Sequence, residues 1–396
     1  MKKIYLPYMC DHARLFAATL RRYGKDAEVL PESNDETLNF GRWACSGKEC
    51  MPCLVTLGDI ICKVKEPSFN RENTQFFFPT ASGPCKYGQY VNLHKLLLEK
   101  LGYGKIEFLS PTSKDGYGEL GSIFMQRRLW QAIVATDIIL KLLYQIRPYE
   151  INKGDADKAY AKALSLLEQA MEKGGIPDAM RRIKDLFAAV RIDVSIKRPR
   201  IGIVGEVFIR LNRFSNQNIA RFVEELGGEA QVSPLSEWIF WTVHTHLERC
   251  IKERTYTKFL KALLRDIVQR VEEERLYGYF KGLLRDMHEP AMQTVMKYAS
   301  PYANFSFGGE AILTIGKAID YVKKGACGIL NLMPFTCMPS TVVAGLAKRI
   351  RADYGWVPWL DIAYDAQEEV NIRTRLEAFM YQANKFQERA LIKEGV

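Results

Sequence analysis

The sequence lacks an apolar segment long enough to cross a membrane. A transmembrane helix needs about 20 mainly apolar residues, and the 396 residues contain no uncharged apolar stretch of about 18. The basic start of the chain is followed by an apolar run that is too short for a signal peptide. These absences predict a cytoplasmic protein that makes no membrane contact.

Fingerprints of nucleotide binding are also missing. Gly202 and Gly205 lie in a strand-like run and the turn after it, but the third glycine of a G-x-G-x-x-G motif is absent. No P-loop sequence occurs, so we expect neither NAD binding nor ATP hydrolysis by this chain. The net charge is +10, yet the basic residues are dispersed and form no patch with interleaved aromatic residues. Nucleic acid is therefore not an expected partner.

Cysteine is not abundant, but its distribution is uneven. Six of the nine cysteines fall in the first quarter of the chain. A disulfide framework is not expected in a cytoplasmic protein, so metal binding or redox chemistry is the better interpretation. Zinc would need about four ligands, typically in two paired knuckles, whereas the sequence has a single C-x-x-C pair and no histidine at zinc-finger spacing. A thioredoxin-like pair of Cys50 and Cys53 would leave the other thiols unexplained.

Several cysteines lie at predicted corners between a strand and a helix. The stretch 43–53 contains Cys45, Cys50 and Cys53, with a proline where the following helix would start. Cys85 follows a glycine and a proline, and Cys337 is followed closely by a proline, each between a strand-like run and a helical run. Free N–H groups and the positive dipole end at a helix N-terminus favour a thiolate. The repeated pattern predicts one shared site.

Two parts of the chain open with the same strand–helix–strand order. Residues 3–30 and 200–232 both show it, and residues 120–195 carry long helical periodicity. We predict an α/β fold with two flavodoxin-like or Rossmann-like parallel-sheet domains and a helical insert between them. Cys10 lies in the loop after the first strand, where such folds bind ligands. The predicted parts are an N-terminal cluster-binding domain at 1–115, a helical linker at 116–199 and a C-terminal α/β domain at 200–396.

Dispersed thiols of this kind are compatible with an iron–sulfur cluster. A cubane takes about three or four thiolates and does not require paired knuckles. Cys62 and Cys250 belong to helical runs and are interpreted as core residues, and Cys327 is an alternative ligand. The six candidate ligands are Cys10, Cys45, Cys50, Cys53, Cys85 and Cys337.

Three cysteine motifs and two further segments resemble a known family. The motifs are S-G-K-E-C-x-P at 46–52, P-T-A-x-G-P-C-x-Y-G-Q-Y at 79–90 and N-x-M-P-F-x-C-M-P at 331–339. Residues 201–238 and the segment R-x-R-L-E-A-F at 373–379 carry the same resemblance. Over nearly the whole chain the sequence is similar to the 2-hydroxyacyl-CoA dehydratase component superfamily, and within it to the dehydratase-activase-related and double-cubane cluster proteins.

The resemblance implies flavodoxin-like domains, oxygen-sensitive iron–sulfur clusters and a homodimer or heterodimer. It also implies a partner, an ATP-hydrolysing activase with its own 4Fe–4S cluster, which passes on an electron at very low potential. Dehydratase subunits of this superfamily hold one 4Fe–4S cluster with three cysteines, and Cys50, Cys85 and Cys337 match those motifs. Double-cubane proteins use six cysteines for an 8Fe–9S cluster, a number that the six candidate thiols match.

We therefore predict an iron–sulfur reductase, a homodimer whose 8Fe–9S cluster receives electrons from the activase and reduces a small molecule. One alternative is the single 4Fe–4S subunit of a 2-hydroxyacyl-CoA dehydratase, and another is a non-catalytic electron carrier or scaffold. His12, Lys48, Glu49 and Gln89 lie beside the thiols in the sequence. They are candidate proton donors or substrate-binding residues, with a structural role in the loops as the alternative.

Overall fold

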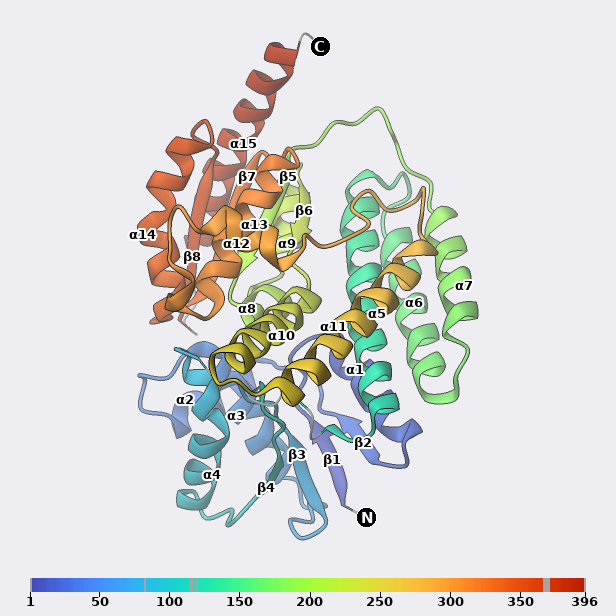
Figure 1. Ribbon diagram of the computed structural model, residues 1–396, viewed down its shortest axis with the longest axis vertical. Helices are drawn as coiled ribbons and strands as arrows, with labels where there is room; N and C mark the ends of the chain where they lie inside the picture. Colours follow the sequence, from blue (N-terminus) through green and yellow to red (C-terminus); the bar gives the residue numbers. More distant parts are fainter. Residues whose placement is uncertain (1, 82, 114–116, 118–119, 366–370, 395–396) are drawn as a thin grey trace.

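The computed structural model describes residues 2–81, 83–113, 117, 120–365 and 371–394. Two four-stranded parallel sheets form its framework (Figure 1). One sheet has the order β2-β1-β3-β4 and the other has the order β6-β5-β7-β8. The predicted α/β fold with two parallel-sheet domains is therefore confirmed. The strands are β1 (Lys3–Leu6), β2 (Asp26–Val29), β3 (Thr74–Phe77), β4 (Glu107–Leu109), β5 (Arg200–Gly205), β6 (Glu229–Val232), β7 (Gly328–Pro334) and β8 (Trp359–Tyr364).

Helices connect the strands, as parallel pairing requires, because each return to the same edge of a sheet needs a crossover connection. Around the first sheet they are α1 (His12–Arg22), α2 (Asp35–Ala44), α3 (Met51–Val64), η1 (Lys86–Gln89) and α4 (Tyr90–Lys100). In the second half they are α8 (Val207–Leu211), α9 (Ile219–Glu225), α10 (Leu235–Lys252), α11 (Tyr256–Gly278), α12 (Met292–Ala299), η5 (Phe305–Phe307), α13 (Glu310–Lys323), α14 (Met338–Asp353) and α15 (Ile372–Glu394).

Local sequence explains where several of these elements begin. Every residue of β7 is buried, as expected of a central strand covered on both faces. Asn34 and Thr37 form a reciprocal capping box at the start of α2, which satisfies N–H groups that the helix leaves free. Both α3 and α14 have a proline in the first turn, where its fixed φ suits a helix and its missing N–H costs nothing.

A third group of helices lies between the two sheets in sequence. It consists of α5 (Ile123–Ile146), the short η4 (Arg147–Tyr149), α6 (Asp155–Lys173) and α7 (Ile176–Ala188). Side chains from these helices share the largest hydrophobic core with α1 and with α10 to α14. The predicted helical insert is thus packed against both halves of the protein. The predicted boundary between residues 115 and 116 lies outside the described residues.

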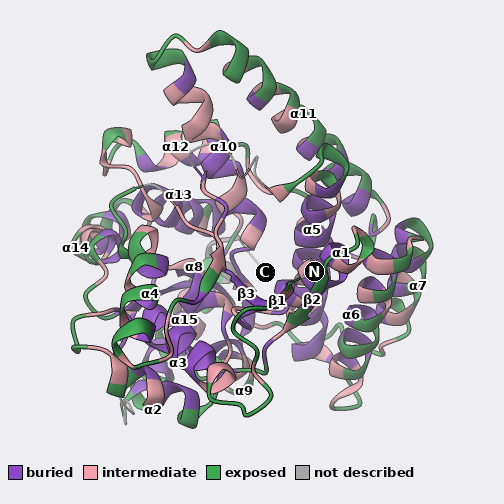
Figure 2. Cartoon of the chain, turned by 90° about the horizontal axis from the view of Figure 1, so that it is seen from below, coloured by how far each residue is buried: buried purple, intermediate pink, exposed green. Residues whose placement is uncertain are grey.

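Helix α5 is the most apolar of these helices. Within the described residues, Ile123–Tyr149 is the one helical segment with the length and composition to cross a membrane, but 78% of its apolar window is buried inside the protein. Figure 2 shows α5 as a largely buried helix next to α1 and α6. Its contacts with α1, α6, α10 and α11 identify it as a core helix of a compact α/β protein.

The carboxyl ends of the strands in the two sheets face one another. Asn212, which follows α8, donates to the carbonyl oxygens of Tyr8 at 3.2 Å and Met9 at 3.1 Å, both in the loop after β1. Lys86, in the segment after β3, donates to Thr336 Oγ1 in the loop after β7 at 3.2 Å. Figure 1 shows the second sheet above the first, with these loops between them. Side chains that follow strands of either sheet can therefore meet in one place.

Candidate cysteine site between the two sheets

Three of the predicted ligands lie at the starts of helical segments. Cys50 is the N-cap residue of α3 and Cys337 is that of α14, each with an extended backbone and a proline two residues later. Cys85 is the N-cap residue of η1, and its sulfur accepts a hydrogen bond from the Tyr87 N–H at 3.4 Å. Each thiol is therefore held by a backbone conformation that the local sequence specifies.

Lys86 ties together the loops that carry these cysteines. Its ammonium group donates to the carbonyl oxygen of Lys48, two residues before Cys50, at 2.9 Å. The same ammonium group donates to Thr336 Oγ1, directly before Cys337, at 3.2 Å. Because Lys86 itself follows Cys85, one side chain joins all three loops.

Close packing around Gly309 gives a second, independent indication that two of the loops meet. A Cβ atom added to Gly309 would lie 3.3 Å from Pro84 Cγ and 3.8 Å from Pro339 Cγ. Pro84 precedes Cys85, and Pro339 lies two residues after Cys337. The Gly308–Gly309 turn has positive φ at both residues, a conformation that favours glycine. This turn places the start of α13 next to the loops that carry Cys85 and Cys337.

Two carboxylates complete this group. Glu206 follows β5 and caps α8 by accepting the Ile209 N–H at 2.8 Å. Glu310 begins α13 and accepts the Val207 N–H at 3.0 Å. Burial raises the pKa of both carboxyl groups, and the charge of Glu206 raises the pKa of Glu310 further. Two carboxylates that cannot both ionise easily can hold a proton beside the thiols.

The same surroundings keep the three thiols protonated when no metal is bound. Burial raises the pKa of Cys50, Cys85 and Cys337, in the last case to about 11, and the charge of Glu206 adds to the effect at each of them. The residue Cys85 is exposed in its loop, but the surrounding protein still desolvates the thiol. Because the charge of Glu206 raises the pKa of all three thiols, they lie in one electrostatic environment.

Cys45 and Cys53 form a pair next to this group. A hydrogen bond to Cys45, together with burial, raises the pKa of Cys53. The Cys53 sulfur also lies 3.6 Å from His94 Nε2, and Cys50 contacts the Tyr90 hydroxyl. The principal contacts of Cys50 and Cys53 are therefore with other side chains and not with each other, unlike in a thioredoxin-like pair. His94, whose pKa burial lowers to about 4, was not recognised as a site residue from the sequence.

Cys10 lies in a different environment. Its sulfur is 3.3 Å from His12 Nδ1, and His12 Nε2 is 2.9 Å from Asp137 Oδ1. In the part of the chain that the structure describes, no contact joins Cys10 to any of the other five candidate thiols. The structure thus gathers Cys50, Cys85 and Cys337, places Cys45 and Cys53 beside them, and leaves Cys10 apart.

The remaining candidate residues have mainly structural contacts. Glu49 accepts the Ser46 hydroxyl at 2.9 Å and the N–H groups of Ser46 and Lys48 at 3.0 Å, and these donors lower its pKa against the opposing effect of burial. Lys48 contributes its carbonyl oxygen to the contact with Lys86 described above. Gln89 accepts from the Asn92 amide at 2.9 Å near the start of α4.

The other three cysteines lie away from this site. Cys250 is buried in α10, as expected of a core residue, whereas Cys62, in the last turn of α3, is partly exposed. Cys327 precedes β7, at the opposite end of the strand from Cys337. Its thiol donates to the Gly325 carbonyl oxygen at 3.8 Å. Cys327 is therefore badly placed to replace one of the ligands.

The spacing of the thiols bears on the kind of metal that they could hold. Among the described residues, no group of three or more His, Cys, Asp or Glu side chains is close enough to bind a single metal ion. A cubane is larger than one ion, so its thiolates stand further apart than the ligands of a zinc site. Thiols on three separate loops fit the larger group better.

Comparison with known proteins does not identify a relative. No protein-family model matches the chain, and no curated protein matches it. The site geometry therefore carries the functional argument.

Proposed function

We propose that the protein is an iron–sulfur oxidoreductase with one 4Fe–4S cluster between its two sheets, held by Cys50, Cys85 and Cys337. The observation that carries the proposal is the meeting of these thiols, from three separate loops, around Glu206 at the facing edges of the sheets. The resemblance of the three motifs to the dehydratase component superfamily supports the same ligand set. A bound cubane supplies one-electron chemistry whose potential depends on hydrogen bonds and charge around its sulfurs.

The chain's own residues would set the conditions for that chemistry. N–H groups at the starts of α3 and α14 favour negatively charged sulfur. The Glu206–Glu310 pair would retain a proton and could deliver it as the site becomes more negative. An open surface hollow of about 520 Å³ lies near the Gly308–Gly309 turn, and it is lined by Tyr302, Ala303, Asn304, Ser306 and Phe307 and by Val342, Gly345 and Leu346 of α14.

An 8Fe–9S double cubane is the second candidate. Cys45 and Cys53 lie next to Cys50 and would supply two of the additional ligands. Cys10 would have to leave His12 to become the sixth ligand, so the observed grouping favours the single cubane. The roles of reductase, dehydratase subunit and electron carrier share the same ligand chemistry, and we place reduction of a small molecule first because the motifs resemble the double-cubane branch of the superfamily.

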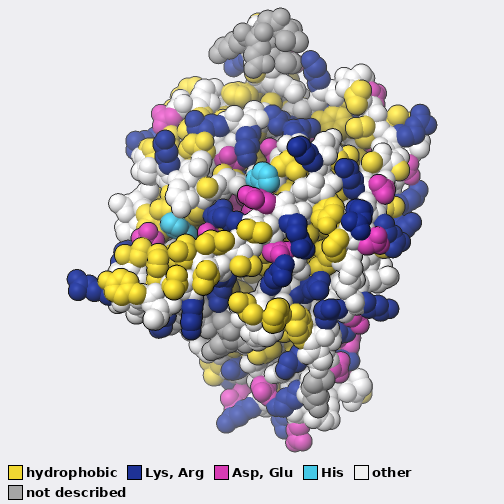
Figure 3. Space-filling model, turned by 45° about the vertical axis from the view of Figure 1, so that its right-hand side comes forward, with side chains coloured by type: hydrophobic (Ala, Val, Ile, Leu, Met, Phe, Trp, Pro, Cys, Tyr) yellow, Lys and Arg dark blue, Asp and Glu magenta, His cyan; other side chains and the backbone are white. Residues whose placement is uncertain are grey.

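The electron donor would be a separate protein, because the chain has no P-loop for ATP hydrolysis. We propose an ATP-hydrolysing activase with its own 4Fe–4S cluster as this donor, a homodimer as the assembly and the cytoplasm as the location. Apolar side chains cluster on the outer face of α11, and Figure 3 shows them as a band across one side of the molecule. An exposed patch of this kind is typical of a protein interface. Its residues, each between 43% and 73% exposed, are Ile251 at the end of α10 and Tyr256, Leu260, Leu264, Ile267, Val268 and Val271 of α11.

The decisive experiment is to purify the protein without oxygen and to measure iron and acid-labile sulfide per chain. We expect about four of each, and we expect Cys50→Ala, Cys85→Ala and Cys337→Ala to lose most of the iron. The matched control is Cys62→Ala, a thiol of the same chain outside the site. About eight iron and nine sulfide would establish the double cubane instead. Wild-type protein without iron or sulfide would refute the cluster.

A further inference from the structure

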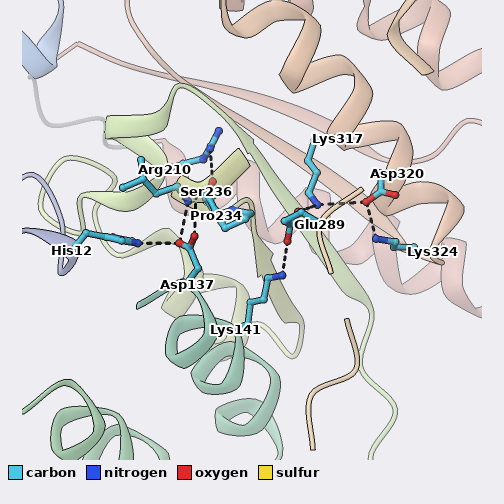
Figure 4. A network of polar contacts seen from close by, with 11 residues as sticks. His12, Asp137, Lys141, Arg210, Pro234, Ser236, Glu289, Lys317, Asp320 and Lys324 are labelled. Carbon is cyan, nitrogen blue, oxygen red and sulfur yellow. Dashed lines mark hydrogen bonds and ion pairs between the residues drawn. The ribbon is translucent and has the colours of Figure 1, made fainter. Parts of the chain in front are cut away.

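Cys10, His12 and Asp137 form a linked chain of side chains outside the cluster site. The Cys10 sulfur lies 3.3 Å from His12 Nδ1, and His12 Nε2 lies 2.9 Å from Asp137 Oδ1. Figure 4 shows His12 and Asp137 pointing toward one another from different elements. The order of thiol, imidazole and carboxylate is the arrangement by which proteins activate a cysteine nucleophile and orient its base.

Asp137 is held firmly in this position. It projects from α5, and its carboxylate accepts the Leu235 N–H at 3.0 Å and the Ser236 N–H at 2.9 Å. These N–H groups belong to the first turn of α10, so a helix N-terminus fixes the carboxylate. A carboxylate held by the backbone can set both the tautomer and the ring orientation of His12, as the third member of such a chain must.

The three side chains are buried to the extent that a nucleophile, its base and an orienting carboxylate require. His12 is 1% exposed and Asp137 is 1% exposed, whereas Cys10 is partly exposed. A reagent can therefore reach the sulfur while the base and its orienting group stay protected from water. Burial opposes the protonated form of His12, but the Cys10 charge and the hydrogen bond to Asp137 outweigh it and raise the pKa of His12 to about 10.

Cys10 also lies at the N-terminus of α1. It directly precedes Asp11, the N-cap residue of α1, whose side chain makes no capping hydrogen bond. The Ala13 and Arg14 N–H groups are bonded to the carbonyl oxygens of Cys10 and Asp11 at 3.0 and 3.2 Å. The positive end of the α1 dipole beside Cys10 favours negative charge that develops on a carbonyl oxygen during acyl transfer.

We propose that Cys10, His12 and Asp137 form a second reactive site, which accepts an activated acyl group from an ester or thioester. Cys10 and His12 are the catalytic residues and Asp137 is the positioning residue. The Cys10 sulfur forms a bond to the acyl carbon while the bond from that carbon to the leaving oxygen or sulfur breaks. The proton of the Cys10 thiol passes to His12 and then to the leaving group, so no electron is gained or lost. The site does not depend on the proposed cluster.

The test is acylation of the full-length protein by p-nitrophenyl acetate. We expect a burst of about one p-nitrophenolate per chain and an acetyl group on the peptide that contains Cys10. Cys10→Ala should abolish the burst, and His12→Gln should slow it by about 100-fold or more. Cys62→Ala, which changes another partly exposed thiol, should leave it unchanged.

Asp137→Asn tests the positioning role. We expect it to slow the burst by about tenfold or more, with a changed pH profile, while the thermal unfolding midpoint shows whether the fold is retained. Equal acetylation of Cys10 and Cys62 would overturn the proposal, because Cys10 would then be an ordinary thiol. Loss of iron in Cys10→Ala would also overturn it, because Cys10 would then be a cluster ligand. Absence of iron in the wild-type protein would refute the cluster alone and leave this site untouched.

Discussion

The two sheets have the same strand order but carry different chemistry at equivalent corners. The third strand of each sheet, β3 or β7, leads to a cysteine, Cys85 or Cys337. The first strand leads to Cys10 and His12 in one sheet and to Glu206 in the other. After the third strand, both sheets therefore carry a cysteine that belongs to the proposed cluster site. After the first strand, the N-terminal sheet carries the proposed reactive thiol, whereas the C-terminal sheet carries a carboxyl group that can hold a proton.

The helices that follow Cys50 and Cys337 can be compared in the same way. Helices α3 and α14 both begin with Cys-Met-Pro and both have a glycine eight residues after the cysteine. Most of α3 is buried, whereas much of α14 is exposed. The matched positions Gly58 and Gly345 can therefore show how far each helix is fixed by its surroundings.

Replacing these glycines by alanine should give the largest difference in stability. A Cβ at Gly58 would lie 1.7 Å from the Thr37 carbonyl oxygen, because α2 and α3 cross with their backbones in contact. We expect Gly58→Ala to lower the free energy of unfolding by about 3 kcal/mol or more. Gly345 has nothing within 4 Å of an added Cβ, so Gly345→Ala should raise it by up to about 1 kcal/mol. Urea unfolding measures both, and similar values for the two variants would show that α3 is not tightly packed.

The residue directly after each of these glycines is charged in one helix and apolar in the other. Asp59 of α3 is buried and receives the Ser33 hydroxyl at 2.8 Å on one oxygen. The corresponding residue of α14 is Leu346. Burial raises the pKa of Asp59 to about 7. A carboxyl group whose pKa is higher in the folded than in the unfolded state contributes stability at low pH and loses it as pH rises toward 7.

We therefore expect Asp59→Asn to remove part of the pH dependence of folding. Between pH 5 and pH 8 the wild-type protein should lose about 2–3 kcal/mol relative to the variant, which has no group to ionise at this position. Unfolding in urea at the two pH values measures this difference, and a constant offset between the proteins does not affect it. Leu346→Ala provides the control, since it changes packing in α14 without changing charge. Parallel pH profiles for wild type and Asp59→Asn would contradict the prediction.

The sequence was sufficient to predict the sheets and the strand–helix corners at Cys85 and Cys337, because these depend on local signals. The same prediction for the stretch 43–53 was wrong, because Cys50 lies between the helices α2 and α3 and not after a strand. Buried strands, capping residues and prolines in first turns are all encoded within a few residues of one another. The same signals predicted that Cys85 and Cys337 would follow strands. Pairing of β5 with β7 joins segments more than 100 residues apart, yet the parallel order follows from the repeated strand–helix–strand pattern.

The polar partners of the site could not be predicted in the same way. Asp137 lies 125 residues from His12, and Glu310 reaches the site through a contact with Val207, 103 residues away. Neither pair has a spacing that a sequence motif could reveal. The one signal that the sequence offered for Glu310 was its place directly after two glycines. The proximity of Cys10 to His12 was visible in the sequence, but its separation from the other thiols depends on the tertiary fold.

The smallest expected effect concerns the residue three positions after each cysteine, Cys53 in α3 and Ser340 in α14. The Ser340 hydroxyl donates to the Cys337 sulfur at 3.3 Å and lowers the pKa of this thiol against the effect of burial. In metal-free protein, Ser340→Ala should therefore slow alkylation of Cys337 by iodoacetamide at pH 8 by about threefold to tenfold, because the thiolate loses one donor. Thr341→Ala is the control, since the Thr341 hydroxyl donates to the Cys337 carbonyl oxygen and not to its sulfur. Faster alkylation in Ser340→Ala would mean that the hydroxyl shields Cys337 more than it stabilises its charge, and the two helices would then differ in access to the thiol and not in its chemistry.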